Sequence, residues 1–375
     1  MVTAPVETPR RGPPCGATLP SVRPQLTPAV RRLWRDRETL QLGRSRGAVV
    51  LAGVDAAARA VLGLLDGTRD EAALVAAASA AGSPPPQTAR VLALLADAGV
   101  HDDAADPSPP CATDRSEREQ RAADRAALRL VRGPTSTAAL RRRAGSGVVV
   151  VGAGRVGAAV AGLLAAAGVG AVQVVDDGLV RPADCGPGGI PLSEVGRRRD
   201  AAATALLGSG VRTGRLLTPD LVLLAPPAGE PLPEPPRQVP HLVAEARDGV
   251  GVVGPLVRPG LSACLRCLDL ARSDRDPDWP ALAVQLATAS GAALACDSAL
   301  ALAVAAQAAL QAVSLLDDGG LPAAVGGTLE LTPPDWRWRR RSWQLHPGCD
   351  CHGYAAAPAS AVAARPAAAQ ATLEA

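Results

Sequence analysis

Residues 148–177 read VVVVGAGRVGAAVAGLLAAAGVGAVQVVDD. Two valine-rich runs separated by a glycine turn and a run of small residues predict a strand, a helix and a second strand. Between the first strand and the helix, Gly152, Gly154 and Gly157 form the pattern G-x-G-x-x-G. The first glycine permits a tight turn, the second lets a phosphate approach the backbone, and the third lets the helix pack on the strand. Asp176 ends the second strand, where a carboxylate can hold ribose hydroxyls, so the stretch predicts a Rossmann-like nucleotide unit.

The following sequence continues to alternate strand and helix patterns as far as residue 354. The predicted strands are Val148–Val151, Val172–Val175, Leu221–Leu224, His241–Ala244 and Gly251–Leu256. The long predicted helices are Val156–Ala167 and Ser298–Leu316. This order implies an α/β domain over residues 128–354, with a mostly parallel sheet covered by helices on both faces.

The sequence before this domain has a different texture. In RRLWRDRETLQLG, the leucines Leu33, Leu40 and Leu42 alternate with polar residues around a charged turn, which predicts a β-hairpin. Three short amphipathic helices follow, so residues 21–104 are predicted to form a small winged-helix-like α+β domain. Residues 1–20 and the Ala/Pro-rich residues 355–375 are predicted to be disordered, and residues 105–127 to be a linker.

Bulk composition excludes several classes of protein. A formal net charge of +3 is too small and too evenly spread to indicate nucleic acid or an anionic membrane as a partner. No uninterrupted apolar run approaches the roughly 20 residues of a membrane span, and the N-terminus lacks the apolar core of a secretory signal. We therefore predict a cytoplasmic protein, in which cysteines serve as ligands or inert thiols rather than disulfides. The chain has no Lys and no Asn, so no mechanism can use either residue.

Four of the eight cysteines occur in two closely spaced pairs, Cys264 with Cys267 and Cys349 with Cys351. A C-x-x-C pair and a C-x-C pair, each beside a glycine or proline turn, can close a tetrahedral zinc site. Four thiolates leave no position for a water molecule, so we expect a structural zinc that staples the end of the domain to its sheet. The other residues considered are two alternative ligands, His346 and His352, and four cysteines without a partner at ligand spacing, Cys15, Cys111, Cys185 and Cys296.

Glycine loop, strand-end acid and split cysteine pairs together resemble the ThiF/MoeB family, relatives of the ubiquitin-activating enzymes. The resemblance spans about residues 144–354 and rests on VGAGRVG, AGVGAVQVVDDGLV, VGRRR, GPLVRPGLSACLRCLDL and HPGCDC. Members of that family adenylate a carboxyl terminus with ATP on a Rossmann-like domain stapled by zinc. The resemblance implies that the three glycines line the ATP phosphates, that Asp176 holds the ribose and that the four cysteines bind zinc. It also makes a homodimer a reasonable expectation.

Departures from the family pattern cluster at the phosphate end of the site. Gly178 stands where the family has a second Asp, Asp184 where it has an Asn, and 187–188 where it has Arg and Gln. Arg199 aligns with the phosphate-binding Lys and keeps the charge without the compact ammonium. The prolines at 226–227 replace the Asp that holds the catalytic magnesium, and proline cannot bind a cation. Because metal and arginine supply most of the charge stabilisation, we interpret the adenylation site as degenerate, without catalytic residues and with ATP binding possible or lost.

The N-terminal pattern LTPAVRRLWRDRETLQLG…LLDGTRDEAALV…VLALLADAGV resembles the PqqD-like elements that bind leader peptides of ribosomally made natural products. Its fusion to a degenerate ThiF-like domain resembles the actinobacterial leader-peptide-binding proteins that work with cyclodehydratases. The resemblance implies that a precursor leader peptide is captured as an added strand beside the hairpin and presented to a partner enzyme.

Three other functions remain open at this point. A live adenylyltransferase would use Arg199 with Asp176 and Asp177 in place of the lost groups. A nicotinamide-dependent oxidoreductase is compatible with any glycine loop, although no substrate domain with a His or Lys acid is evident. A winged-helix DNA-binding protein would need a basic recognition helix, whereas QTARVLALLADAG has one Arg and one Asp. The segment WRWRRRSWQLHPG is interpreted as an edge strand with tryptophans packed inward and arginines in solvent.

Overall fold

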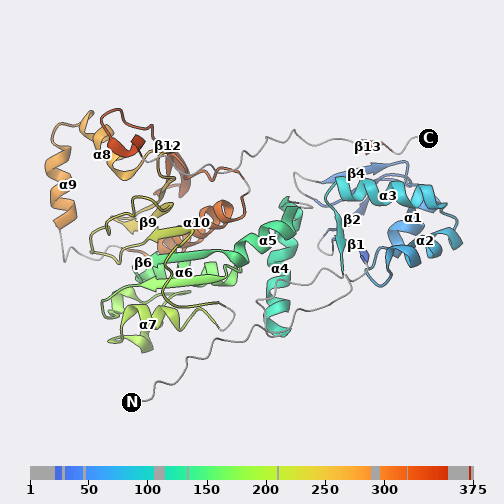
Figure 1. The fold of residues 1–375 in the computed structure, drawn as a ribbon, viewed down its shortest axis with the longest axis horizontal. Helices are drawn as coiled ribbons and strands as arrows, with labels where there is room; N and C mark the ends of the chain where they lie inside the picture. Colours follow the sequence, from blue (N-terminus) through green and yellow to red (C-terminus); the bar gives the residue numbers. More distant parts are fainter. Residues whose placement is uncertain are drawn as a thin grey trace, which may run out of the picture. The chain divides into compact units, whose positions relative to one another are not determined.

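The computed structural model describes residues 22–27, 30–44, 48–104, 115–132, 135–208, 211–288, 296–318, 320–353 and 371–372. The chain divides into two compact units (Figure 1). The first comprises residues 1–107 and 368–375, and the second comprises residues 108–367. Each unit is described by itself below.

The first unit contains a small sheet, a two-stranded ribbon and three helices. Its elements are β1 (Pro24–Leu26), β2 (Arg32–Trp34), β3 (Leu40–Leu42), β4 (Val49–Ala52), α1 (Ala56–Leu64), α2 (Glu71–Ala80), α3 (Pro85–Asp97), β5 (His101–Asp103) and β13 (Ala371–Thr372). The small sheet has the order β13-β4-β3-β2, and β1 pairs antiparallel with β5. The predicted hairpin and the three predicted helices are all present.

The three leucines of the hairpin differ in burial. Leu40 and Leu42 are buried in the core of this unit with residues of all three helices. Leu33 is 38% exposed and therefore lies on the surface. Asp55 caps α1 by accepting a hydrogen bond from Ala58 N–H at 2.7 Å, as such a residue does at a helix start. Local sequence signals therefore explain the secondary structure of this unit.

The second unit begins with a helix and is built around one large sheet. Its elements are α4 (Arg115–Arg132), α5 (Ser136–Gly145), β6 (Gly147–Val151), α6 (Arg155–Ala166), β7 (Ala171–Val175), η2 (Pro182–Asp184), η3 (Leu192–Glu194), α7 (Arg199–Thr204), β8 (Leu221–Leu224), β9 (His241–Arg247), β10 (Val250–Val257), α8 (Leu265–Ser273), α9 (Trp279–Thr288), α10 (Ser298–Leu316), β11 (Gly327–Thr332), β12 (Arg337–Ser342) and η4 (Asp350–Gly353). Within the predicted linker 105–127, residues from Arg115 onward are helical. In the predicted tail 355–375, the described residues are those of β13.

Seven strands form the sheet in the order β12-β11-β10-β9-β8-β6-β7. The four strands β7, β6, β8 and β9 pair in parallel, and this is the α/β arrangement that the sequence predicted. The three strands β10, β11 and β12 pair antiparallel. The strand predicted at 251–256 therefore belongs to an antiparallel extension, not to the parallel alternation. Asp248 and Gly249 both have positive φ, at 53° and 72°, and such a two-residue turn folds β10 directly back on β9.

The two faces of the sheet have separate apolar cores. α6, α7 and α10 contribute to the larger core, which consists mostly of alanine, valine and leucine. On the opposite face, Val222, Leu224 and Val243 pack against the loop around Leu232 and against Leu265 of α8. α10 is long and apolar enough to cross a membrane, but half of its apolar window is buried, which is typical of a core helix. Cores made of such small side chains bring helix and strand backbones close together.

The tryptophan and arginine segment forms the edge strand β12, as predicted. Trp338 packs against the larger core, and Trp343, just beyond the strand, is 5% exposed. Trp336 differs from the prediction because it is 53% exposed in the turn before the strand, with φ of 49°. The four arginines of β12 are exposed to solvent.

Candidate functional site

The glycine loop joins β6 to α6 with the close contacts that the G-x-G-x-x-G pattern predicts. Gly152 has φ of 97°, and a Cβ there would lie 2.1 Å from the Ala225 carbonyl oxygen. A Cβ on Gly157 would lie 2.0 Å from the Gly152 carbonyl oxygen. These two positions accept only glycine, because any side chain would collide with fixed backbone. The loop thus has the geometry of a Rossmann-type unit.

Gly154, the N-cap of α6, faces a proline instead of open space. A Cβ at this position would lie 2.8 Å from Cα of Pro227. Pro226 and Pro227 follow β8, so the strand end that carries them packs directly on the glycine loop. Proline offers neither a cation ligand nor an N–H donor at this point. In the described structure the second glycine therefore admits protein backbone where the pattern predicts a phosphate.

Asp176 lies directly after β7 and is 8% exposed. Its Oδ2 accepts a hydrogen bond from Ala153 N–H at 2.8 Å, within the glycine loop itself. Its Oδ1 accepts hydrogen bonds from Gly178 N–H at 2.9 Å and from Arg199 Nε at 2.8 Å. Both oxygens of the carboxylate predicted to hold ribose are thus bound by the protein.

Arg199, at the start of α7, forms ion pairs with three carboxylates. Its guanidinium lies 2.8 Å from Asp176, 3.3 Å from Asp184 and 2.8 Å from Glu230, and the arginine side chain is 4% exposed. Burial opposes its charge, but the hydrogen bond and charge of Asp176 and the charge of Glu230 raise the pKa of the guanidinium. A buried arginine with charged partners on several sides is a structural cross-link of the domain.

Arg181 completes this network, which we call the Arg199 cluster: Asp176, Arg181, Asp184, Arg199 and Glu230. Arg181 lies 2.8 Å from Asp184 and 3.3 Å from Glu230. Burial works to raise the pKa of Asp184, but hydrogen bonds from Arg181 and the charges of both arginines hold it below its usual value. Gly178 fits against this cluster because a Cβ there would lie 2.3 Å from Arg199 Nη2. An aspartate at that position would have to displace the guanidinium.

A small pocket lies beside the cluster in the part of the chain that the structure describes. A pocket bordered by Arg155, Asp184, Pro226 and Cys296, among others, has a volume of about 10 Å³. That volume is close to the minimum that one water molecule requires. Arg155 covers it by donating hydrogen bonds to the carbonyl oxygens of Cys185 at 3.0 Å and Cys296 at 2.6 Å.

Sequence reasoning identified some of these residues and missed others. Gly152, Gly154, Gly157, Asp176 and Arg199 were all predicted, and the structure brings them together. Arg181, Glu230 and the ion-pair role of Asp184 were not predicted. Glu230 lies in a proline-rich loop with no periodic pattern, so no local signal could have connected it with Arg199.

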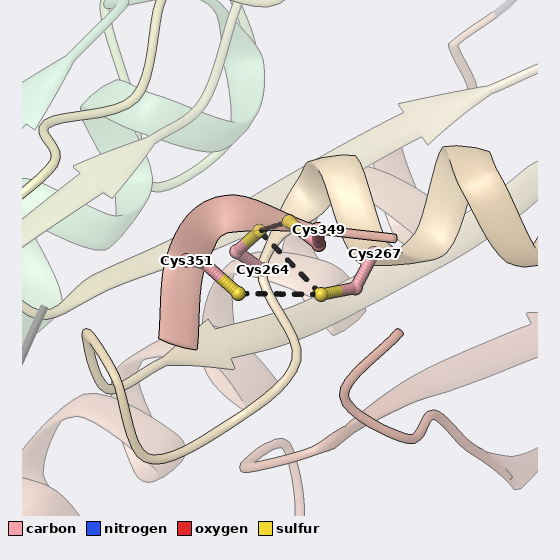
Figure 2. Close-up of side chains that lie close together, drawn as sticks. All are labelled: Cys264, Cys267, Cys349 and Cys351. Atoms are coloured by element: carbon pink, nitrogen blue, oxygen red, sulfur yellow. Dashed lines mark hydrogen bonds between the residues drawn. The ribbon is translucent and has the colours of Figure 1, made fainter. Parts of the chain in front are cut away.

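The four predicted cysteine ligands lie close together in the second unit (Figure 2). Their sulfur atoms all lie within 4.8 Å of one another. The Sγ–Sγ distances are 3.8 Å from Cys264 to Cys267, 3.7 Å from Cys264 to Cys349 and 3.4 Å from Cys267 to Cys351. A tetrahedral ion with Zn–S bonds of about 2.3 Å requires sulfur atoms about 3.8 Å apart. The donor set and its spacing therefore fit zinc.

Both cysteine pairs are held by short, well-defined elements. Cys264 is the N-cap of α8 and Cys267 lies in its first turn, while Cys351 lies in η4, directly after Cys349 and Asp350. Burial raises the pKa of Cys264 to about 11. For Cys267 burial also opposes ionisation, but backbone hydrogen bonds, first that of His346 N–H, lower the pKa to about 7. One thiol is thus prepared for ionisation, and a bound cation would ionise the others.

The alternative ligands predicted from the sequence have other surroundings. The ring of His346 contacts Asp274 through Nε2 at 2.8 Å and accepts a hydrogen bond from Gly348 N–H at Nδ1. The side chain of His352 lies outside the described structure, as do Cys15 and Cys111. Cys185 is buried against the carbonyl oxygens of Arg181 and Pro191, and burial raises its pKa.

In the first unit, the outer edge of β4 has a strand beside it. The short strand β13 pairs in parallel with β4, with Ala371 opposite Leu51 and Thr372 opposite Ala52. On the other side, β4 pairs antiparallel with β3 of the hairpin. The edge of β4 in this small sheet therefore accommodates an added extended segment.

Together these features define a Rossmann-type α/β domain with a cysteine cluster, preceded by a small α+β unit. Residues 125–209, which include the glycine loop and Arg199, match the ThiF family. No curated protein matches the chain in sequence.

Several solved structures share the fold over nearly their whole length. E. coli MccB with ATP is 13% identical, with 88% of this chain and 99% of that chain covered and a TM-score of 0.61. The microcin C7 biosynthetic enzyme MccB with N-formylated MccA is 14% identical, with the same coverages and TM-score. PaaA is 16% identical, with 84% of this chain and 99% of that chain covered and a TM-score of 0.61. At these identities the likeness shows the fold.

Proposed function

We propose that this protein binds the leader peptide of a ribosomally made precursor and presents it to a modifying enzyme of the cyclodehydratase type. The first unit provides the binding surface, and the ThiF-family domain serves as a scaffold with a degenerate adenylation site. The four cysteines hold a structural zinc ion that pins the chain around residues 349–351 to the start of α8.

The Arg199 cluster is the main observation that supports a degenerate adenylation site. Nucleotide binding would require Asp176 to hold ribose hydroxyls while it already accepts three internal hydrogen bonds. Arg199 would have to leave the buried Asp184 and the partly exposed Glu230 to reach a phosphate. Leaving a buried carboxylate without its partner costs several kcal/mol, roughly 3–5. The prolines at 226–227 also supply no ligand for the magnesium on which attack at an α-phosphate depends.

The edge of β4 supports the peptide-binding part of the proposal. Because β13 pairs there through its backbone, the same edge can give a leader peptide main-chain hydrogen bonds, with neighbouring side chains setting its register. A protein of the same fold, MccB, has been solved with MccA bound. Peptide handling by this architecture is therefore consistent with the proposal.

A working adenylyltransferase is the second candidate function. The specific observation in its favour is that MccB, with the same fold, has been solved with ATP. The glycine loop itself is intact in this chain, and Asp176 is present. In that case Arg199 would serve as the phosphate-binding cation.

Titration of the full chain with candidate leader peptides, followed by hydrogen exchange, tests the proposal. We expect saturable binding with slower amide exchange in residues 49–52. ATP–pyrophosphate exchange with the same peptides should remain at background. Removal of residues 355–375 should strengthen peptide binding, because β13 then no longer competes for the edge. Protection confined to the second unit, or peptide-dependent pyrophosphate exchange, would favour the adenylyltransferase instead.

A further inference from the structure

β7 is the outermost strand at one end of the seven-stranded sheet, and part of its outer edge has no partner strand. Val172 N–H donates to the Arg212 carbonyl oxygen, and Arg212 N–H donates to the Gly170 carbonyl oxygen. Alternate residues of a strand direct their backbone groups to the same side, so Val174 also faces this outer edge. The backbone of Val175 faces the other side of β7, because its carbonyl oxygen accepts a hydrogen bond from Gly152 N–H in the glycine loop.

The segment beside β7 stops following it after a single bridge. Arg212 forms an isolated parallel bridge with Ala171, and the backbone then turns at Gly214, where φ is 146°. A residue continuing in parallel would receive the Val174 N–H and donate to the Val172 carbonyl oxygen. Among the described residues, no hydrogen bond is made to either group on this side. The outer edge of β7 therefore has room for one further stretch of strand.

A groove runs along this edge. Its volume is about 650 Å³, and it is lined by β7 at Val172–Val174, by residues of and beside α7, and by Thr213–Arg215. α7 packs beside β7, and residues of both elements and of the turn at Gly214 line the groove. The walls combine small side chains, such as Ala201 and Ala205, with the backbone of the strand edge. Such a groove suits an extended backbone better than a compact ligand.

The positive charge at the groove favours an acidic occupant. Arg198 is paired with Asp200 at 2.7 Å, whereas the second groove arginine, Arg215, has no ion pair among the described residues. Among the described residues that line the groove, Arg215 therefore supplies a positive charge without an ion pair. At the far edge of the same sheet, β12 carries four exposed arginines with two carboxylates, Asp335 and Glu330, within ion-pair distance. The strand therefore keeps a positive charge that does not complement Arg215 in a second copy. An acidic segment of a different polypeptide has the complementary charge.

We infer that the groove between β7 and α7 is a docking site for an extended segment of a second polypeptide that carries an acidic side chain. The segment adds to β7 through the Val172 carbonyl oxygen and the Val174 N–H, and its carboxylate pairs with Arg215. This site lies in the ThiF-family domain and does not depend on leader binding at β4.

The experiment selects binders from a displayed library of random octapeptides on the full chain and measures their affinity as synthetic peptides. Ala201→Trp fills the groove from α7, and Ala306→Trp places the same bulk on an exposed position of α10 as the matched control. Arg215→Glu reverses the unpaired charge, and Arg337→Glu on β12 controls for the change in net charge. We expect acidic peptides whose affinity falls about tenfold or more with Ala201→Trp and up to about fivefold with Arg215→Glu. Neither control should change the affinity.

Hydrogen exchange with a bound peptide locates the site directly. Protection of the Val174 amide is the expected result. The inference is overturned if the selection recovers no acidic peptides, or if the recovered peptides bind the Ala201→Trp variant as tightly as the parent protein. A change in the oligomeric mass of the Ala201→Trp variant in sedimentation also overturns it, because the groove would then join copies of this chain. Circular dichroism and thermal melting confirm that each variant is folded before its affinity is interpreted.

Discussion

The cysteine cluster and the Arg199 cluster lie in the same unit, but their side chains have different partners. Four thiols meet at the spacing that one tetrahedral ion requires, and the sulfur atoms mostly face one another. Asp176 and Arg199 instead take their partners from the protein, with three donors on one carboxylate and three carboxylates around one guanidinium. One site is arranged around a ligand, whereas the other is completed by the chain itself. Under the proposed function, the domain keeps a structural ion site, whereas its nucleotide site is filled by the charged residues of the chain.

The largest expected effect is on the cysteine cluster. Cys267→Ser removes the central buried ligand, and structural zinc contributes roughly 10 kcal/mol or more of apparent binding energy to such sites. We expect the variant to lose zinc and to melt far below the parent protein. Metal analysis and thermal unfolding measure both effects.

Cys296→Ser is the matched control, because this half-buried cysteine lies outside the cluster. It should keep the zinc content of the parent. Full zinc content in Cys267→Ser would show that the four thiols are not a metal site.

Arg199→Ala tests whether the second cluster is structural. Removal of this guanidinium leaves Asp176 buried without its cation and leaves Asp184 with Arg181 alone, which costs about 3–5 kcal/mol. The neighbouring control is Arg198→Ala, whose solvent-exposed pair with Asp200 should contribute little to stability. Urea unfolding compares the two variants, and equal stabilities would mean that Arg199 is free to serve a ligand.

Gly178→Ala sharpens the same comparison. The added Cβ would lie 2.3 Å from Arg199 Nη2, whereas a Cβ on Gly186 would have its nearest contact at 3.6 Å. We expect a loss of about 1–3 kcal/mol for Gly178→Ala and little change for Gly186→Ala. Combined with Arg199→Ala, the alanine at 178 should be tolerated. An equal penalty in both backgrounds would separate Gly178 from the cluster.

Acidification gives the smallest effect. The pKa of Asp184 in the folded protein lies below its ordinary value of 3.8, so the unfolded chain binds its proton first. Its contribution to stability is present above that ordinary value and is lost as the pH falls through the lower, folded value. Unfolding free energies measured from pH 5 to pH 3 should fall less steeply in Asp184→Asn than in the parent. Parallel slopes would show that this carboxyl is not held ionised by its arginines.

Local patterns in the sequence predicted the parts of the fold that depend on local chemistry. The glycine loop and its flanking strands follow from residues 148–177 alone, and paired spacing identified all four cysteines. The antiparallel turn at Asp248 and Gly249 was also encoded, since Asp-Gly between two apolar runs is a strong hairpin signal. It was overlooked because the preceding strands favoured a parallel order.

The ion-pair partners could not be predicted for a different reason. Asp184, Arg199 and Glu230 come from a short 3-10 helix, a helix start and a proline-rich loop, and only the tertiary fold brings them together. The resemblance in sequence predicted departures from the family pattern at 178 and 226–227. It did not show that an internal arginine cluster occupies the same region.

Calorimetric titration of the full chain with magnesium-ATP tests the central claim most directly. If Asp176 and Arg199 are bound by the protein, no saturable heat should appear up to millimolar nucleotide. Saturable binding that is lost in Asp176→Ala would contradict this account, because the nucleotide would then have displaced the Arg199 cluster.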